Sequence, residues 1–162
     1  MDPSGSYNEG KGTTGYCLFD VRQNRILKAS SIKASKYVSQ NDYWNEHTTL
    51  ITNCFVNFKN LIVVLEDYVL YADKAKTQIN SKMETCRLLG ILQNHCNSLK
   101  IPCFLELASA VKQRWNDKVL CYKGYMQKRK NTYFVNDTVV DRHAKDAIRH
   151  AVHYKTFYNK GD

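Results

Sequence analysis

The chain has 162 residues, a length typical of one domain that buries a core of its own, so we expect a single domain over residues 1–162. With 43% hydrophobic and 24% charged residues, the composition excludes wholesale disorder. No apolar run approaches the roughly 20 residues that cross a bilayer, and no basic-then-apolar leader opens the chain, so a cytoplasmic protein without a membrane partner is expected. The formal net charge of +9 favours a polyanionic partner, most simply nucleic acid.

The cysteines carry no signature of disulfides or of metal binding. All six stand singly inside apolar segments, and none forms a CxxC pair. In a cytoplasmic chain this pattern indicates reduced cysteines that act as small buried hydrophobic residues. The five histidines also lack the spacing of a structural zinc site.

Four segments have the pattern of strands. Residues 15–20 and 25–32 are expected to form a hairpin through a polar turn at 21–24. Residues 61–65 are a continuous aliphatic run, which suits a strand that is covered on both faces and has parallel neighbours. A further short strand is expected at 103–107, directly after Pro102.

Helices are expected between and after these strands. Apolar residues recur at helical spacing over residues 42–59, 81–99, 108–115 and 139–158. Asp42 is the expected N-cap of the first helix, and Ser81 with Glu84 forms a capping box for the second. Residues 116–138 are basic and aromatic without a clear period, so they are expected to be irregular. The order of elements predicts an α/β fold.

Acidic residues that lie far apart in the sequence stand at informative places. Glu66 follows the aliphatic strand, at the edge where α/β sheets usually carry their sites. His143 and Asp146 share a face of the last predicted helix, and His150 lies on nearly the same stripe. Asp2 precedes the Gly-rich segment GKGTTG, whose backbone suits a tight turn or an anion.

Each of these residues alone fits a surface or core-edge position, but together they indicate a metal site. Carboxylates that gather from separate elements repel one another unless a cation lies among them. Hard divalent ions such as Mg²⁺ prefer oxygen ligands, and two such ions about 3.5–4 Å apart can cleave a phosphodiester.

Five segments carry a family resemblance: DPSG…GKGTTG with its following strand, LIVVLEDY, MET…LLG, ASAVKQRW and HAKDAIRHAVHY. They span nearly the whole chain, and the last is the most specific. Through them the chain resembles the RuvC-like Holliday-junction resolvases, particularly the phage-type members, in the ribonuclease-H-like superfamily. The resemblance implies a mixed sheet of an antiparallel hairpin and parallel strands, flanked by helices, in a bacterial or phage-infected host cytoplasm.

The resemblance also assigns roles to particular residues. It makes Asp2, Glu66 and Asp146 the acidic ligands of Mg²⁺ or Mn²⁺, with two ions expected. His143 stands where the family has an acidic residue or a histidine, and Asp141 is a less well-spaced alternative. Lys112 stands where the family places a basic residue near the scissile phosphate; Lys118 is the alternative there.

The start of the chain departs from this pattern. In these folds the catalytic aspartate lies on a central first strand, with several apolar residues ahead of it, whereas only Met1 precedes Asp2 here. The first strand is therefore apparently truncated. Because a missing central strand exposes the edges of its neighbours, we expect a short apolar strand upstream of Met1 in the functional protein.

The function expected from the resemblance is that of a crossover junction endodeoxyribonuclease, a magnesium-dependent enzyme that hydrolyses phosphodiester bonds in four-way junctions or other branched DNA. Two alternatives keep the fold. One is a ribonuclease-H-like nuclease that acts on another nucleic acid, such as an RNA–DNA hybrid. The other is a DNA-binding protein whose catalytic site is disabled.

A basic and aromatic stretch is the candidate DNA-binding surface. Its basic residues would join Lys112 in contacting phosphates; they are Lys118, Lys123, Lys128, Arg129 and Lys130. The interleaved Tyr122, Tyr125 and Tyr133 fit base stacking or simple burial equally well. Paired incisions in a junction favour a homodimer. Met83, Leu88 and Leu92 of the predicted helix 81–99 suit either a dimer interface or the core.

Overall fold

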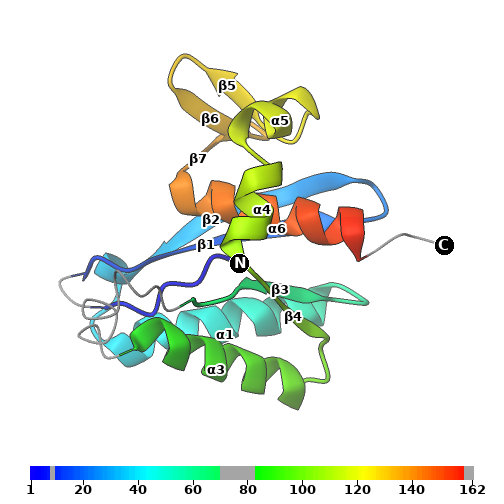
Figure 1. Ribbon diagram of the computed structural model, residues 1–162. Coiled ribbons are helices and arrows are strands. Elements are labelled where there is room, and N and C mark those ends of the chain that lie inside the picture. Colours follow the sequence, from blue (N-terminus) through cyan, green and yellow to red (C-terminus); the bar gives the residue numbers. More distant parts are fainter. Residues whose placement is uncertain (8–9, 70–82, 159–162) are drawn as a thin grey trace.

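The computed structural model describes residues 1–7, 10–69 and 83–158, and these form a mixed α/β protein (Figure 1). Strand β1 (Thr13–Asp20) pairs antiparallel with β2 (Arg25–Lys33), as the hairpin prediction required. Strand β3 (Val63–Glu66) pairs in parallel with β4 (Cys103–Glu106), which confirms the parallel neighbour expected for the aliphatic run. Strands β5 (Gln127–Arg129), β6 (Thr132–Val135) and β7 (Thr138–Val140) form a separate antiparallel sheet.

The helices surround these strands. The principal ones are α1 (Gln40–Asn57), α3 (Glu84–Ser98) and α6 (Arg142–Phe157). Two short helices, α4 (Ala108–Arg114) and α5 (Asp117–Tyr122), lead from β4 to the small sheet, and a 3₁₀ turn, η2 (Ala34–Lys36), follows β2. In Figure 1 the small sheet and α5 project from the body, with α4 as their connection.

Met1 and Asp2 lie between the two main strand pairs. Asp2 exchanges two backbone hydrogen bonds with Gly15 on β1, at 2.9 and 3.1 Å. On the other side, the amide of Glu66 donates to the carbonyl of Met1 at 2.8 Å, and the Met1 amino group donates to the carbonyl of Val64. Burial lowers the pKa of that amino group. Residues 1–2 therefore join β1 to β3 as a short strand would.

Alternation along β3 places helices on both of its faces. Val63 and Leu65 are buried in an apolar cluster with residues of α1 and α3. Because successive side chains in a strand point to opposite faces, Glu66 points the other way, where it contacts His150 on α6. A second apolar cluster, which includes Val111, Trp115, Ala144 and other residues of α6, lies on that side.

The helix starts differ from the sequence prediction. Ser39, not Asp42, caps α1, because its side chain accepts the amide hydrogen of Asp42. Helix α3 begins at Glu84 after Met83, and the capping-box residue Ser81 lies outside the described residues. Asp141 caps α6, because its Oδ1 accepts from the amide of Ala144 and from the Ser31 hydroxyl; its alternative role as a ligand stays a prediction.

Residues 116–138 were expected to be irregular, and this prediction is wrong. They form α5, β5 and β6, and β7 takes in Val139 and Val140, which had been assigned to the last helix. Apolar side chains explain the order in this region. Leu120 and Met126, together with Val135 and Val140, are buried against α6.

Two expectations about apolar residues also change. All six cysteines are free, but Cys96 alone among them is fully buried. Leu88 and Leu92 are completely buried in the core of this chain, so they are not available to a dimer interface. No helix in the described part of the chain has the length and apolar character required to span a bilayer.

Candidate functional site

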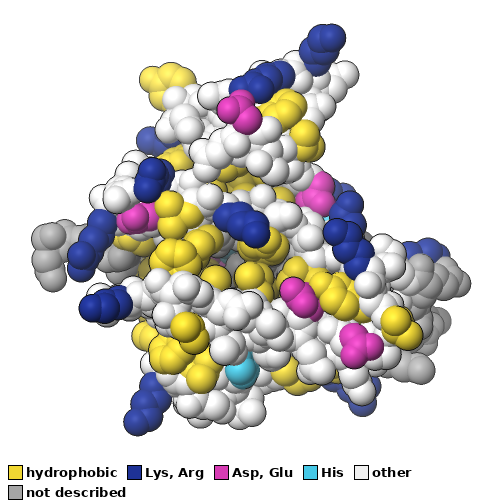
Figure 2. Space-filling view, turned by 180° about the vertical axis from the view of Figure 1, so that it is seen from behind, with side chains coloured by type: hydrophobic (Ala, Val, Ile, Leu, Met, Phe, Trp, Pro, Cys, Tyr) yellow, Lys and Arg dark blue, Asp and Glu magenta, His cyan; other side chains and the backbone are white. Residues whose placement is uncertain are grey.

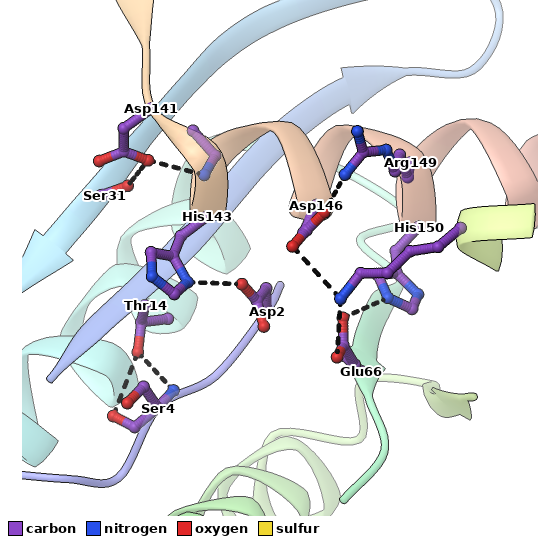
Figure 3. A network of polar contacts seen from close by, with 12 residues as sticks. Asp2, Ser4, Thr14, Ser31, Glu66, Asp141, His143, Asp146, Arg149 and His150 are labelled. Atoms are coloured by element: carbon purple, nitrogen blue, oxygen red, sulfur yellow. Dashed lines mark hydrogen bonds and ion pairs between the residues drawn. The ribbon is translucent and has the colours of Figure 1, made fainter. Parts of the chain in front are cut away.

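Three acidic residues from separate elements, Asp2, Glu66 and Asp146, converge in one region of the structure (Figure 3). The Lys112 ammonium on α4 lies 3.4 Å from Glu66 Oε1 at the end of β3 and 3.2 Å from Asp146 Oδ2 on α6. Asp2 is held next to Glu66 because its own strand segment pairs with β3. Asp146 is 5% exposed and Glu66 17%, so the carboxylates line a largely desolvated site.

His143 completes this group from the first turn of α6. Its Nδ1 lies 2.8 Å from Asp2 Oδ2, and this hydrogen bond raises the pKa of the imidazole. The contact depends on a close approach between α6 and β1. A Cβ on Gly15 would lie 1.9 Å from the His143 carbonyl oxygen, so Gly15 is what lets the helix reach Asp2.

Two buried side chains, His150 and Glu106, fix the position of Glu66. His150 Nε2 lies 2.9 Å from Glu66 Oε2, and His150 Nδ1 lies 2.9 Å from Glu106 Oε2. Burial alone lowers the pKa of His150, but hydrogen bonds to the two carboxylates outweigh it and raise that pKa. Burial likewise favours protonation of Glu66, yet His150 and Lys112 lower its pKa. Glu66 is thus kept ionised and fixed in orientation.

Asp146 is fixed by a second set of charges. Arg149 bridges Asp146 and Asp117, and its Nε donates to the carbonyl of Trp115 at 2.8 Å. Lys145 lies 2.7 Å from the other oxygen of Asp117. These contacts connect Asp146 to α5, the helix that precedes the small projecting sheet.

The loop that follows Asp2 is anchored by a buried polar network. The Thr14 hydroxyl accepts from the amide of Ser4 at 2.9 Å and contacts Tyr43 Oη at 3.2 Å and His47 Nε2 at 2.7 Å. Tyr43 donates to the carbonyl of Ser4 at 2.8 Å. Thr14, Tyr43 and His47 are all fully buried. The side chain of Asp2 is therefore placed by groups that belong to β1 and α1.

The predicted site residues divide into two groups in space. Asp2, Glu66, His143, Asp146 and Lys112 are brought together. The predicted phosphate-binding residues are instead exposed on the projecting unit: Lys118, Lys123, Lys128, Arg129 and Lys130.

The tyrosines of this unit also differ from one another. Tyr122 is 92% exposed and is available for stacking. Tyr125 is partly buried and donates to Asn24, while Tyr133 lies under the Lys145 ammonium at 4.1 Å. Packing within the protein therefore accounts for Tyr125 and Tyr133, and base stacking remains open to Tyr122.

Sequence reasoning missed Glu106 and the Arg149–Asp117 pair. A signal for Glu106 was present, because VVLE of β3 and CFLE of β4 both end in glutamate, and parallel pairing sets Glu66 opposite Glu106. One oxygen of Glu106, Oε1, is buried without a hydrogen-bond partner in the described structure. Asp117 follows an ordinary N-cap and had no recognisable pattern.

The donor set suits a hard divalent cation. Within residues 1–7, 10–69 and 83–158, no cluster of three or more His, Cys, Asp and Glu side chains is already arranged as a metal site. However, the Lys112 ammonium is a cation held between Glu66 and Asp146, and these carboxylates raise the pKa of Lys112 despite its partial burial. Carboxylate oxygens that hold one cation in this way match the ligands preferred by Mg²⁺.

Comparison with known proteins adds no relative to this picture. A scan against models of known protein families gave no match, and a search among curated proteins also gave none.

Proposed function

We propose that this chain is a metal-dependent endonuclease of the RuvC-like type, with a ribonuclease-H-like fold, that cleaves four-way junctions or other branched DNA. The observation that carries the proposal is that Glu66 and Asp146 converge on Lys112, while the strand segment that carries Asp2 pairs directly with Glu66. The succession β2, β1, Met1–Asp2, β3 and β4 supports the sheet arrangement implied by the resemblance.

In this proposal Asp2, Glu66, Asp146 and His143 would hold Mg²⁺ or Mn²⁺. When bound, two such ions would supply a water of lowered pKa and would neutralise charge on the departing 3′ oxygen. The protein orients the donors: His150 fixes Glu66, and Arg149 fixes Asp146. Lys112 is placed to contact a phosphate at the edge of the acidic group, because its side chain is still 39% exposed.

The projecting unit supports a nucleic-acid partner. Lys128 and Arg129 on β5 and Lys130 after it are all exposed, as are Lys118 on α5 and Lys123 directly after that helix. Phosphate contacts of this kind are insensitive to base sequence and depend strongly on salt. Asp117 on α5 forms an ion pair with Arg149, which also pairs with Asp146 of the acidic group. DNA bound to the projecting unit would therefore lie near the acidic group.

The test compares cleavage by the wild-type chain and by Glu66→Gln on a synthetic four-way junction in Mg²⁺. Glutamine keeps the side-chain volume but lacks the charge, so cleavage should fall to background while junction binding and thermal stability persist. Asp20→Asn is the matched control, because Asp20 lies at the far end of β1, where its carboxylate accepts from the amide of Gln23. Unchanged nicking by Glu66→Gln would refute the proposal.

The same assay separates the alternatives. Preferential cleavage of an RNA–DNA hybrid would favour a different nuclease activity on the same fold. Tight, salt-dependent junction binding without cleavage in either Mg²⁺ or Mn²⁺ would favour a DNA-binding protein. A homodimer is part of the proposal because a junction has two symmetric scissile strands, and sedimentation velocity on the junction complex tests it.

A further inference from the structure

The three-stranded sheet of the projecting unit has one face on the body of the protein and one face turned away from it. Val135 and Val140 are buried in the cluster that contains residues of α6, so they mark the first face. Because successive side chains in a strand point to opposite faces, Phe134 and Val139 belong to the second. These two residues pair across β6 and β7, and Val139 is 58% exposed. The outer face of the sheet therefore carries Phe134 and Val139.

Strand β5 adds two polar residues to this outer face. Gln127 pairs with Phe134, and residues that are directly opposite in an antiparallel pair share a face. Arg129 lies two residues further along β5 and therefore shares that face too. Every residue of β5 is exposed. Figure 2 shows Lys and Arg, acidic and hydrophobic side chains next to one another on the projecting unit, at the top of the view.

The guanidinium of Arg129 has a fixed place on the outer face. Its central carbon lies over the Phe134 ring, 4.8 Å from the ring centre. Its Nη2 donates to Gln127 Oε1 at 2.9 Å and to the carboxylate of Asp137. The side chain of Arg129 is nevertheless 53% exposed. Since ordering a free arginine costs a ligand binding energy, these contacts reduce that cost for a ligand of the outer face.

The charge of Arg129 is already paired, which distinguishes it from the neighbouring lysines. The Asp137 carboxylate weakens the attraction of this guanidinium for a phosphate and repels a phosphate itself. The guanidinium plane and the Phe134 ring instead suit a flat, uncharged ligand, because both groups stack well on a nucleobase. In duplex DNA the faces of the bases are covered by their neighbours. The chemistry of the outer face therefore fits an unpaired base.

The residues on either side of Arg129 supply the charge that a nucleotide chain requires. Lys130 follows Arg129 in the turn after β5, and Lys128 projects from the other side of this edge strand. Both lysines are exposed, so phosphates on two sides of Arg129 can be contacted. A stacking surface flanked by cations is the arrangement with which proteins bind single strands.

We propose that the outer face of this small sheet binds single-stranded DNA, with an unpaired base stacked on the guanidinium of Arg129 above Phe134. Gln127 and Asp137 are positioning residues that hold the guanidinium over the ring. Lys128 and Lys130 contact the flanking phosphates. The inference rests on the proposed function in one respect, that DNA is the partner, and it names the unpaired strand of a branched substrate as the part that this unit binds.

The experiment measures equilibrium binding by fluorescence anisotropy in EDTA. The probes are an oligothymidylate of about 12 nucleotides, a strand of the same length that is abasic throughout, and a duplex of the same length. Arg129→Lys is the decisive variant, because lysine keeps the positive charge but has no planar group to stack on a base. Phe134→Leu removes the ring beneath the guanidinium and keeps an apolar side chain.

We expect the wild type to bind the oligothymidylate about tenfold more tightly than the abasic strand or the duplex, as one base-stacking contact allows. Arg129→Lys should lose about tenfold in affinity for the oligothymidylate and bind it no better than the abasic strand. The slope of log Kd against log salt should stay the same in this variant, since no charge is removed. Phe134→Leu should also bind the oligothymidylate more weakly. Arg87→Lys, the same change on exposed α3 at the opposite end of the molecule, should bind as the wild type does (Figure 1).

Wild-type affinity in Arg129→Lys would overturn the inference, because it would show that only the charge of this residue matters. Equal binding of the abasic strand, or of the duplex, by the wild type would overturn it as well. The assay contains no divalent ion, so its outcome does not depend on cleavage. Junction cleavage in Mg²⁺ without oligothymidylate binding would overturn this inference alone, whereas oligothymidylate binding without junction cleavage would overturn only the proposed endonuclease activity.

Discussion

His47 should make the stability of this protein depend on pH in a way that can be isolated. Its Nδ1 donates to the Tyr43 carbonyl at 2.7 Å, so in the neutral ring Nε2 accepts from the Thr14 hydroxyl. A second proton would place a buried charge that bonds only to a carbonyl and a hydroxyl among the described residues. Burial accordingly lowers the pKa of His47 from 6.5 to about 4.

The sign and size of the change in stability with pH follow from proton linkage. Between pH 6.5 and 4 the unfolded chain binds more protons at this position than the folded chain does, so stability is full above pH 6.5 and falls as the pH is lowered. The loss is about 2 kcal/mol at pH 5 and about 3 kcal/mol at pH 4, relative to pH 7. His143 and His150, whose pKa values their carboxylate partners raise, act in the opposite direction.

The assay is urea unfolding of wild type and His47→Gln at pH 7, 5 and 4. The titrations of all other groups are common to both proteins, so the difference between their pH profiles isolates His47. We expect the wild type to lose about 2–3 kcal/mol more than His47→Gln across this range. Parallel profiles for wild type and His47→Gln would show that the reasoning is wrong.

Three further predictions concern backbone packing and DNA binding. Gly15→Ala should destabilise the fold by about 1–3 kcal/mol, because its Cβ meets the His143 carbonyl. Gly90→Ala, in the open middle of α3, should stabilise it by about 0.5–1 kcal/mol in the same thermal unfolding assay. Lys128→Gln should weaken junction binding and lower the slope of log Kd against log salt by about one; an unchanged slope would exclude a phosphate contact at Lys128.

The sequence predicted the elements with strong periodicity. The β1–β2 hairpin was readable from its two strand-like segments around a polar turn, and β3 with Glu66 at its end from its continuous aliphatic run. The pairing of His143 with Asp146 was readable from the helical period of the last segment. Strands β5 and β7 have only three residues each, which is too short to establish a period. Their order comes from contacts with α6, and these are tertiary.

In the candidate site, too, local sequence patterns could be predicted and tertiary contacts could not. Spacing along α6 indicated that Asp146 and His143 share a face, but no local pattern indicated that Arg149 would reach Asp117 on another helix. Glu106 could be found from the repeated glutamate at the ends of β3 and β4. Its hydrogen bond to His150 depends on the packing of α6 across the parallel pair.

The structure changes one step of the sequence argument for metal. Clustered carboxylates were expected to need a bound cation, yet each one here has a cationic or imidazole partner: His143 for Asp2, His150 and Lys112 for Glu66, and Lys112 and Arg149 for Asp146. A divalent ion must therefore compete with the Lys112 ammonium for Glu66 and Asp146.

Lys112→Met tests this competition directly. Removing a unit charge that lies 3.2–3.4 Å from two carboxylates favours any other cation there. Because Lys112 is partly exposed, screening reduces the gain to about 1 kcal/mol, or roughly fivefold in Kd for Mg²⁺ by calorimetry. Lys118→Met, on exposed α5, should leave the Kd unchanged. Junction cleavage by Lys112→Met should fall at the same time, since the side chain that we propose to contact the phosphate is lost. Weaker Mg²⁺ binding by Lys112→Met than by wild type would mean that the ion does not occupy the space between Glu66 and Asp146.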